Sequence, residues 1–332
     1  MRLSGARRIR AAVFLAGVAA LVAVTFEAGM EPVLRALAML KFSGLGIVTL
    51  IHLPVLALLG LAWWYAGRGL MDARPSAFVA ARLARDSIAE VLPFSQLGGF
   101  VGGVRVLTLA GAKALEATLA MFADLVAEFS AKLLYTLAGL LALAWLLPHT
   151  PLVRPFSLVL VGASLAFGLV LLFRRRFRAA LNRIVLWGLR KSAPLQAQEY
   201  ADRDRGRLFT ARHFLPSLTV HALCWVLGAG EAWVTLRLMG VHAGLGQALV
   251  IDSLGTAFRT LGFLVPGALG VQEAGYVIVC ALFGIAPAGA VAFSLARRAR
   301  DLLIGLAGLG LWQVLEIRKA ALRPCQSGSA KL

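Results

Sequence analysis

Charged residues interrupt the most apolar part of the chain, directly after a predicted break in a helix. Pro266, Gly267 and Gly270 disfavour a continuous helix, and Glu273 follows the break. A second charged run stands in the next apolar stretch and comprises Arg297, Arg298, Arg300 and Asp301. Ionisable groups at membrane depth are costly and usually face a cavity or one another. Broken helices there need cover from protein or a water-filled cavity. These residues therefore predict a polar site inside a membrane.

The chemistry expected of this site is recognition of a polar headgroup. Arginine binds phosphate through two parallel hydrogen bonds, so we expect Arg297 or Arg298 to hold a phosphate or headgroup. Consecutive helical residues differ by about 100°, so the arginines cannot all point the same way. We expect another of them to pair with Glu128 or Glu273. The carboxylate of Glu273 either only caps the half-helix that follows the break or also belongs to the site.

A polar stripe is also predicted in the first half of the chain. Asp124, Glu128 and Lys132 are spaced four residues apart on a long apolar helix. They form either an intrahelical salt-bridge ladder or the lining of a headgroup path. The preceding segment, Ile88–Leu107, carries a proline and two glycine pairs, which predicts a re-entrant or broken segment. The remaining candidate path residues are Gln96, Gly98, Gly99, Arg105 and Gln272. The glycines serve either as hinges or for close helix packing.

Composition places the chain in a membrane. Apolar residues make up 60% of the 332 residues, and the mean hydropathy is +0.81. Soluble domains hold about 45–50% apolar residues. At about 20 residues per span, six to eight transmembrane helices fit. The net charge of +18 comes from basic residues between apolar runs, which is the positive-inside pattern and argues against nucleic-acid binding. We predict an all-α polytopic protein of a bacterial-type inner membrane, with both termini in the cytoplasm.

The predicted organisation is one integral membrane domain over residues 1–332. A cytoplasmic loop is marked by Arg68, Arg74, Arg82 and Arg85, a segment at Glu31–Ser43 lies outside, a basic cytoplasmic loop covers 174–212, and a short polar tail covers 319–332. The continuous spans are expected at about Ile9–Met30, Gly44–Ala66, Ala117–Leu147, Phe156–Phe173, Phe214–Met239 and Pro287–Leu315.

An internal repeat is indicated by a shift of 169 residues, which places Glu128 on Arg297 and Lys132 on Asp301. The order of features also recurs: a helix, a broken glycine segment and a long helix with charges. The loop charges give the two long helices opposite directions. We therefore predict two inverted repeats, about 1–150 and 151–318, with the site at their interface near mid-membrane. The alignment suggests that Glu128 pairs with Arg297, and Lys132 with Asp301.

The second half resembles a known family. The sequence Pro-Gly-Ala-Leu-Gly-Val-Gln-Glu-Ala from Pro266, followed by Ala292 to Arg298, is similar to the flippase-like membrane domain of lysylphosphatidylglycerol synthases (MprF type). Pro93, Gly98 and Arg105 resemble the Pro-x-x-x-Gly-Glu-x-x-Arg pattern of that family's first half, although Gly99 replaces the acid and Arg105 is displaced. Glu128 resembles the glutamate of a Glu-Arg pair, with Phe129 in place of the arginine. The Pro-Phe-Ser-Gln-x-Gly-Gly variant resembles the hopanoid-associated HpnL-type branch.

The resemblance covers nearly the whole chain and implies a lipid translocase. The expected substrate is a hopanoid or modified phospholipid, and the expected partners are membrane lipids and proteins of lipid biosynthesis or export. The family's synthase activity lies in a separate soluble domain, for which this chain has no room. The alternatives are an intramembrane lipid-modifying transferase and a non-catalytic scaffold of a lipid-synthesis complex.

Signatures of catalysis and cofactor binding are weak. The five histidines are scattered without metal-ligand spacing, so we expect no metal, no cofactor and no catalytic residue. No Gly-Lys-Ser/Thr phosphate loop is present, which argues against an ATP-driven pump within the chain. The three cysteines do not form a disulfide framework, and Cys224 and Cys280 are expected as small buried side chains.

Overall fold

The computed structural model describes residues 15, 18–91, 96–151, 210–262 and 265–321, together with isolated residues between 154 and 183. Every regular element in these ranges is a helix, which confirms the all-α class. The predicted span at Phe156–Phe173, the basic loop at 174–212 and the tail at 319–332 fall largely outside the described residues. Of the predicted first span, the structure describes a helix at Val18–Ala28.

The same succession of elements occurs twice along the chain. The first set is α2 (Met30–Gly67), α3 (Pro75–Val91), α4 (Gln96–Leu109) and α5 (Ala114–Leu146). The second set is α9 (Ala211–Leu238), α10 (Leu245–Leu261), the 3-10 turn η1 (Pro266–Ala268), α11 (Val271–Ala281) and α12 (Pro287–Ala321). Each set is a long helix, a pair of short helices and a second long helix.

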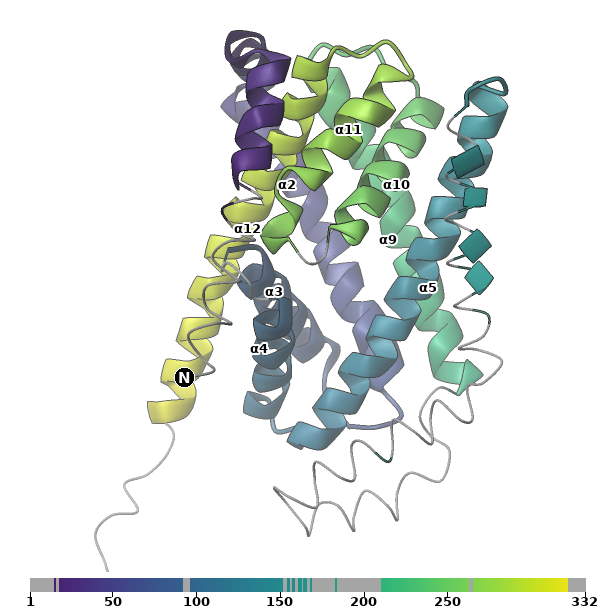
Figure 1. The fold of residues 1–332 in the computed structure, drawn as a ribbon. Coiled ribbons are helices and arrows are strands. Elements are labelled where there is room, and N and C mark those ends of the chain that lie inside the picture. Colours follow the sequence, from purple (N-terminus) through teal and green to yellow (C-terminus); the bar gives the residue numbers. More distant parts are fainter. Residues whose placement is uncertain are drawn as a thin grey trace, which may run out of the picture.

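The packing between elements repeats in the same way. Within the sets, α2 packs on α3 as α9 packs on α10, and α4 packs on α5 as α11 packs on α12. Between the sets, α12 packs on α2 and α3 as α5 packs on α9 and α10. The short pairs α3–α4 and α10–α11 lie toward opposite ends of the molecule, and α5 and α12 run in opposite directions (Figure 1). The pair α2–α9, which are equivalent helices, forms the centre of the contact between the sets.

Each short helix pair rests on its own hydrophobic core. The core of the first set contains Trp63, Phe78, Val106, Leu107 and Met121. The larger core of the second set also takes residues from α2 and α5, and it contains Leu140, Ile251, Leu254, Tyr276 and Phe293. Cys224 and Cys280 are buried free thiols, as predicted. The two cores hold the short pairs in place beside the long helices.

Close packing explains two glycines of the predicted broken segment. A Cβ on Gly99 would lie 2.5 Å from the backbone oxygen of Arg85, and one on Gly103 would lie 2.9 Å from the Trp63 ring. Neither distance leaves room for a side chain, so these glycines allow α4 to approach α3 and α2 closely. Of the two roles considered for the glycines, the structure favours packing at these positions.

Two expectations about the first set are wrong. The segment Glu31–Ser43 is not separate from the next helix, because α2 runs from Met30 to Gly67 with one bend at Lys41, whose φ is 55° and ψ 164°. Arg82 and Arg85 do not mark a cytoplasmic loop: they lie in α3 and are only 5% and 8% exposed. The positive-inside rule counts arginines without their partners, and these two have carboxylates opposite them on α5.

Two described helices are both long and apolar enough to cross a membrane. They are α2, with a mean hydropathy of 2.3 over its most apolar window, and α5, with 1.6. The helices α9 and α12 have 28 and 35 residues, and charged side chains interrupt their apolar runs. Most of these charges point into the protein, where they form the site described next.

Candidate functional site

A first charge network joins α3, α5 and α9. Both arginines of α3 bind Glu128, with Arg82 Nη2 3.0 Å from Oε1 and Arg85 Nη2 2.9 Å from Oε2. Arg85 Nη1 also donates to Asp124 Oδ2 at 3.2 Å. The network is completed by Asp86, 2.7 Å from Arg82 Nε, and by His221, whose Nε2 lies 2.9 Å from Asp124 Oδ1. Asp124 and His221 are completely buried. We call these six residues the first charge network.

A second charge network connects both helix sets. Arg259 of α10 pairs with Glu90 of α3 and lies 3.5 Å from Asp301 of α12. Asp301 also accepts from Arg300 Nη2 at 2.6 Å, and Arg300 pairs with Glu231 of α9. The chain of contacts ends at His52 of α2, whose Nδ1 lies 2.7 Å from Glu231 Oε2. These six side chains (Glu90, Arg259, Asp301, Arg300, Glu231 and His52) are the second charge network.

The helix break places Glu273 as the sequence predicts. Gly267 and Gly270 adopt φ values of 62° and 77°, which suit glycine, and α11 starts directly after them. Glu273 Oε2 accepts from the backbone N–H of Gly270 at 2.8 Å, so the predicted capping is confirmed. Its other oxygen accepts from Arg298 Nε at 2.7 Å and from Ser294 Oγ at 2.8 Å. The carboxylate therefore caps the half-helix and also binds an arginine.

Arg298 ties this region to the break itself. Its Nη1 donates to the backbone oxygen of Gly267 at 2.9 Å, and its side chain is 17% exposed. Gln272 donates to Ser294 Oγ at 3.1 Å and is almost fully buried. Arg298 is thus held by the loop and by Glu273 while part of its guanidinium remains accessible.

The expected pairing of Glu128 with Arg297 is wrong. Arg297 pairs with Asp252 of α10, which also accepts from the Tyr135 hydroxyl at 2.7 Å. Glu128 is already occupied by the two arginines of α3. Lys132 does not pair with Asp301 either: its Nζ lies 3.2 Å from Thr260 Oγ1 and 5.2 Å from the centre of the Trp225 ring.

The proposed intrahelical ladder on α5 is also wrong, because Asp124, Glu128 and Lys132 each bind residues of other helices. Arg105 lies apart from both networks. It pairs with Glu316 of α12 at 2.8 and 2.9 Å, and the two side chains are 44% and 30% exposed. Gln96 begins α4, its side chain lying outside the described part, and Gly98 and Gly99 follow it in the same helix. Pro266 begins η1.

Sequence reasoning missed half of the charged site. Arg82 and Arg85 were assigned to a loop, and no pairing was predicted for His52, Glu90, His221, Glu231, Asp252 or Arg259. The repeat offset contained a signal for four of these. His52 and His221 are 169 residues apart, as are Glu90 and Arg259.

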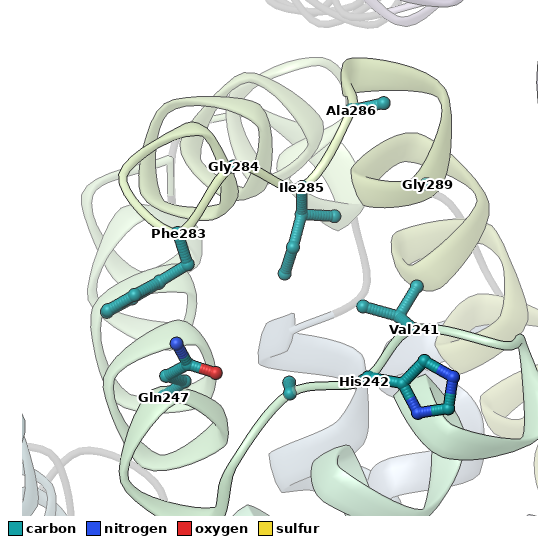
Figure 2. A pocket seen from close by; sticks show the side chains of 9 residues that line it. Val241, His242, Gln247, Phe283, Gly284, Ile285, Ala286 and Gly289 are labelled. Carbon is teal, nitrogen blue, oxygen red and sulfur yellow. The ribbon is translucent and has the colours of Figure 1, made fainter.

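A cavity lies away from these charges, at one end of the second set. It has a volume of about 350 Å³ and is bordered by the α9–α10 and α11–α12 connections. Figure 2 shows Val241, His242 and Gln247 on one side and Phe283, Ile285 and Ala286 on the other. No charge-network residue lines it. Among the described residues, no group of three or more His, Cys, Asp and Glu side chains is placed to hold a metal ion.

The helices and their buried charges define an α-helical membrane protein. Residues 9–308 match the family model described as the lysylphosphatidylglycerol synthase TM region. The chain belongs to this family, and its function concerns membrane lipids. The match is to the family as a whole and does not distinguish its branches. Neither the curated proteins nor the solved structures that we compared with the chain gave a match.

Proposed function

We propose that this protein is a multi-pass inner-membrane lipid translocase that moves an amphiphilic lipid, a hopanoid or modified phospholipid, between leaflets. In this proposal the two helix sets are inverted repeats, six to eight helices cross the bilayer, and both termini lie in the cytoplasm. The role is transport rather than catalysis. Membrane lipids are the ligands, and proteins of lipid biosynthesis or export are the partners that deliver or receive them.

The observation that carries the proposal is the meeting of the two short helix pairs at buried charges. Inverted-repeat transporters bind substrate near the midplane, between repeats and beside broken helices. Here the pairs come from opposite ends of the molecule (Figure 1), and Glu90 of one pair binds Arg259 of the other. Charges inside a membrane are costly and are usually retained for function. The arrangement therefore supports a polar passage between the repeats.

The partly exposed arginines are the proposed headgroup ligands. Arg298 and Arg297 are each held by one carboxylate, Glu273 and Asp252, and both retain some exposure. A lipid phosphate can share such a guanidinium because arginine has five donors and the carboxylate uses only some of them. We propose that Glu128, Asp124, Lys132, Arg300 and Asp301 hold the passage in shape, while the apolar outer faces of α2 and α5 accept the lipid tail.

Lipidomics of the two leaflets tests the proposal against its alternatives. Cells with and without the protein would be labelled by a reagent that cannot cross the membrane, and the lipids would be identified by mass spectrometry. We expect the same lipid species with a changed distribution between leaflets. A new or missing lipid species would instead indicate an intramembrane transferase. An unchanged distribution with unchanged species would contradict translocation and favour a scaffold.

A further inference from the structure

The two charge networks have the same chemical composition. The first holds Asp86, Asp124 and Glu128 against Arg82 and Arg85, with His221 at its end. The second holds Glu90, Glu231 and Asp301 against Arg259 and Arg300, with His52 at its end. Each therefore contains three carboxylates, two guanidinium groups and one histidine. With the histidine neutral, each carries one excess negative charge.

The two histidines occupy equivalent places in the repeat. His52 in α2 and His221 in α9 are separated by 169 residues, the same offset that relates Glu90 to Arg259. Each histidine binds a carboxylate of a neighbouring helix, at 2.7 Å for His52 and Glu231 and at 2.9 Å for His221 and Asp124. The duplication of the histidine–carboxylate pair in both halves argues for one role performed twice.

The surroundings of each histidine were considered in full. Besides Glu231, His52 is within electrostatic range of Asp86 of α3 and of Arg297, Arg300 and Asp301 of α12. Besides Asp124, His221 is near Glu128 of α5 and the two arginines of α3 that bind these carboxylates. Lys132 is the nearest further cation to the first network, and its ammonium is bonded to Thr260 rather than to a carboxylate. The excess negative charge of each network is therefore not neutralised by direct contact with another cation.

His221 has an atom free to receive a proton. The residue is completely buried, its Nε2 is bound to Asp124, and its Nδ1 has no hydrogen-bond partner. An unpaired net charge inside a protein is strongly unfavourable, and uptake of a proton removes it. His52 and Asp86 are partly exposed, so a proton can reach the end of each network.

We propose that each charge network is a proton-binding site, so that the protein binds two protons at equivalent positions of its two halves. The proton is shared between the histidine and its carboxylate partner and balances the third carboxylate. Proton binding does not depend on the lipid function. Its consequence, that lipid movement is coupled to a proton gradient, rests on the proposed translocase activity.

Proton counting on the purified full-length protein tests this directly, with no lipid substrate present. The protein in neutral detergent is titrated from about pH 10 to about pH 5, and the protons bound are compared with those bound by variants. Asp124→Asn and Glu231→Gln each leave two carboxylates against two arginines in one network. We expect about one proton fewer for each variant and about two fewer for the double variant. Glu316→Gln, in the exposed pair with Arg105, is the matched control and should bind as many protons as the wild type.

Equal uptake by the wild type and the double variant would overturn the proposal, as would an equal loss in Glu316→Gln. Helix content and elution volume establish that each variant is folded. Where Asp124→Asn or Glu231→Gln does not fold, Asp86→Asn and Glu90→Gln remove the same charge from the partly exposed ends of the networks, with the same expected loss. Because no lipid is assayed, a negative lipidomics result does not alter the outcome of this test.

Discussion

The carboxylate of Glu90 in α3 binds the guanidinium of Arg259 in α10, and the two residues are repeat equivalents 169 positions apart. Equivalent positions meet only close to the axis that relates the two halves. This pair therefore joins the two short helix pairs where the halves meet. Its charges are opposite although its positions are equivalent, so the contact requires that the two halves differ in sequence here.

Exchanging the charges of this pair tests whether it acts as a unit. Glu90→Arg and Arg259→Glu each place like charges together, and we expect both to lower the free energy of unfolding and the rate of lipid translocation. The double exchange should recover most of the loss, with a coupling energy of about 1 kcal/mol because the pair is only partly buried. Unfolding in mixed micelles measures this energy. Additive losses would show that the two residues do not depend on each other.

Truncation of Glu128 should be the most destabilising single change in the first network. Glu128→Ala leaves Arg82 and Arg85 without their shared partner, and breaking a buried ion pair costs about 3–5 kcal/mol. The same truncation at Glu316, whose pair with Arg105 is exposed, should cost less than about 1 kcal/mol. Equal costs for Glu128→Ala and Glu316→Ala in chemical unfolding would show that the network does not stabilise the fold.

The break before α11 makes a prediction that a matched glycine can control. Gly270→Ala forces an L residue into a φ of 77°, a conformation that costs about 1–2 kcal/mol, and its Cβ would collide with Ala20. Gly284 has a similar φ of 70° with open space around it. We expect Gly284→Ala to show the conformational cost alone and Gly270→Ala to lose more stability. A Gly270→Ala variant no less stable than Gly284→Ala would contradict the close contact.

Local signals in the sequence predicted much of the fold. The glycine and proline break at 266–270, the cap formed by Glu273 and the extents of α5 and α9 follow from residue types within a few positions, and they are present in the structure. Pairing between distant charges was less predictable. Arginines in α3 resemble loop arginines until the carboxylates of α5 are known to face them, and Arg297 selects Asp252 because α10 lies beside it.

The repeat offset was used too narrowly. Aligning the long charged helices suggested that equivalent residues 128 and 297 would pair, but the equivalent residues that meet are Glu90 and Arg259 in the short helices. Long helices on opposite sides of an axis are kept apart by the elements between them. A residue reaches its own counterpart only where the element lies at the axis, as α2 and α9 also do.

Translocation by the purified protein is the most direct measurement of the central claim. Vesicles containing the protein would carry a fluorescent phospholipid in both leaflets, and a membrane-impermeant quencher would be added outside. We expect quenching beyond the outer leaflet with the wild type, and a loss of about tenfold or more in Arg298→Gln, which removes a charge-assisted contact of about 1.5–3 kcal/mol. Arg105→Gln should retain the wild-type rate. Quenching limited to the outer leaflet with the wild type, or equal rates in the wild type and Arg298→Gln, would contradict the proposed lipid passage.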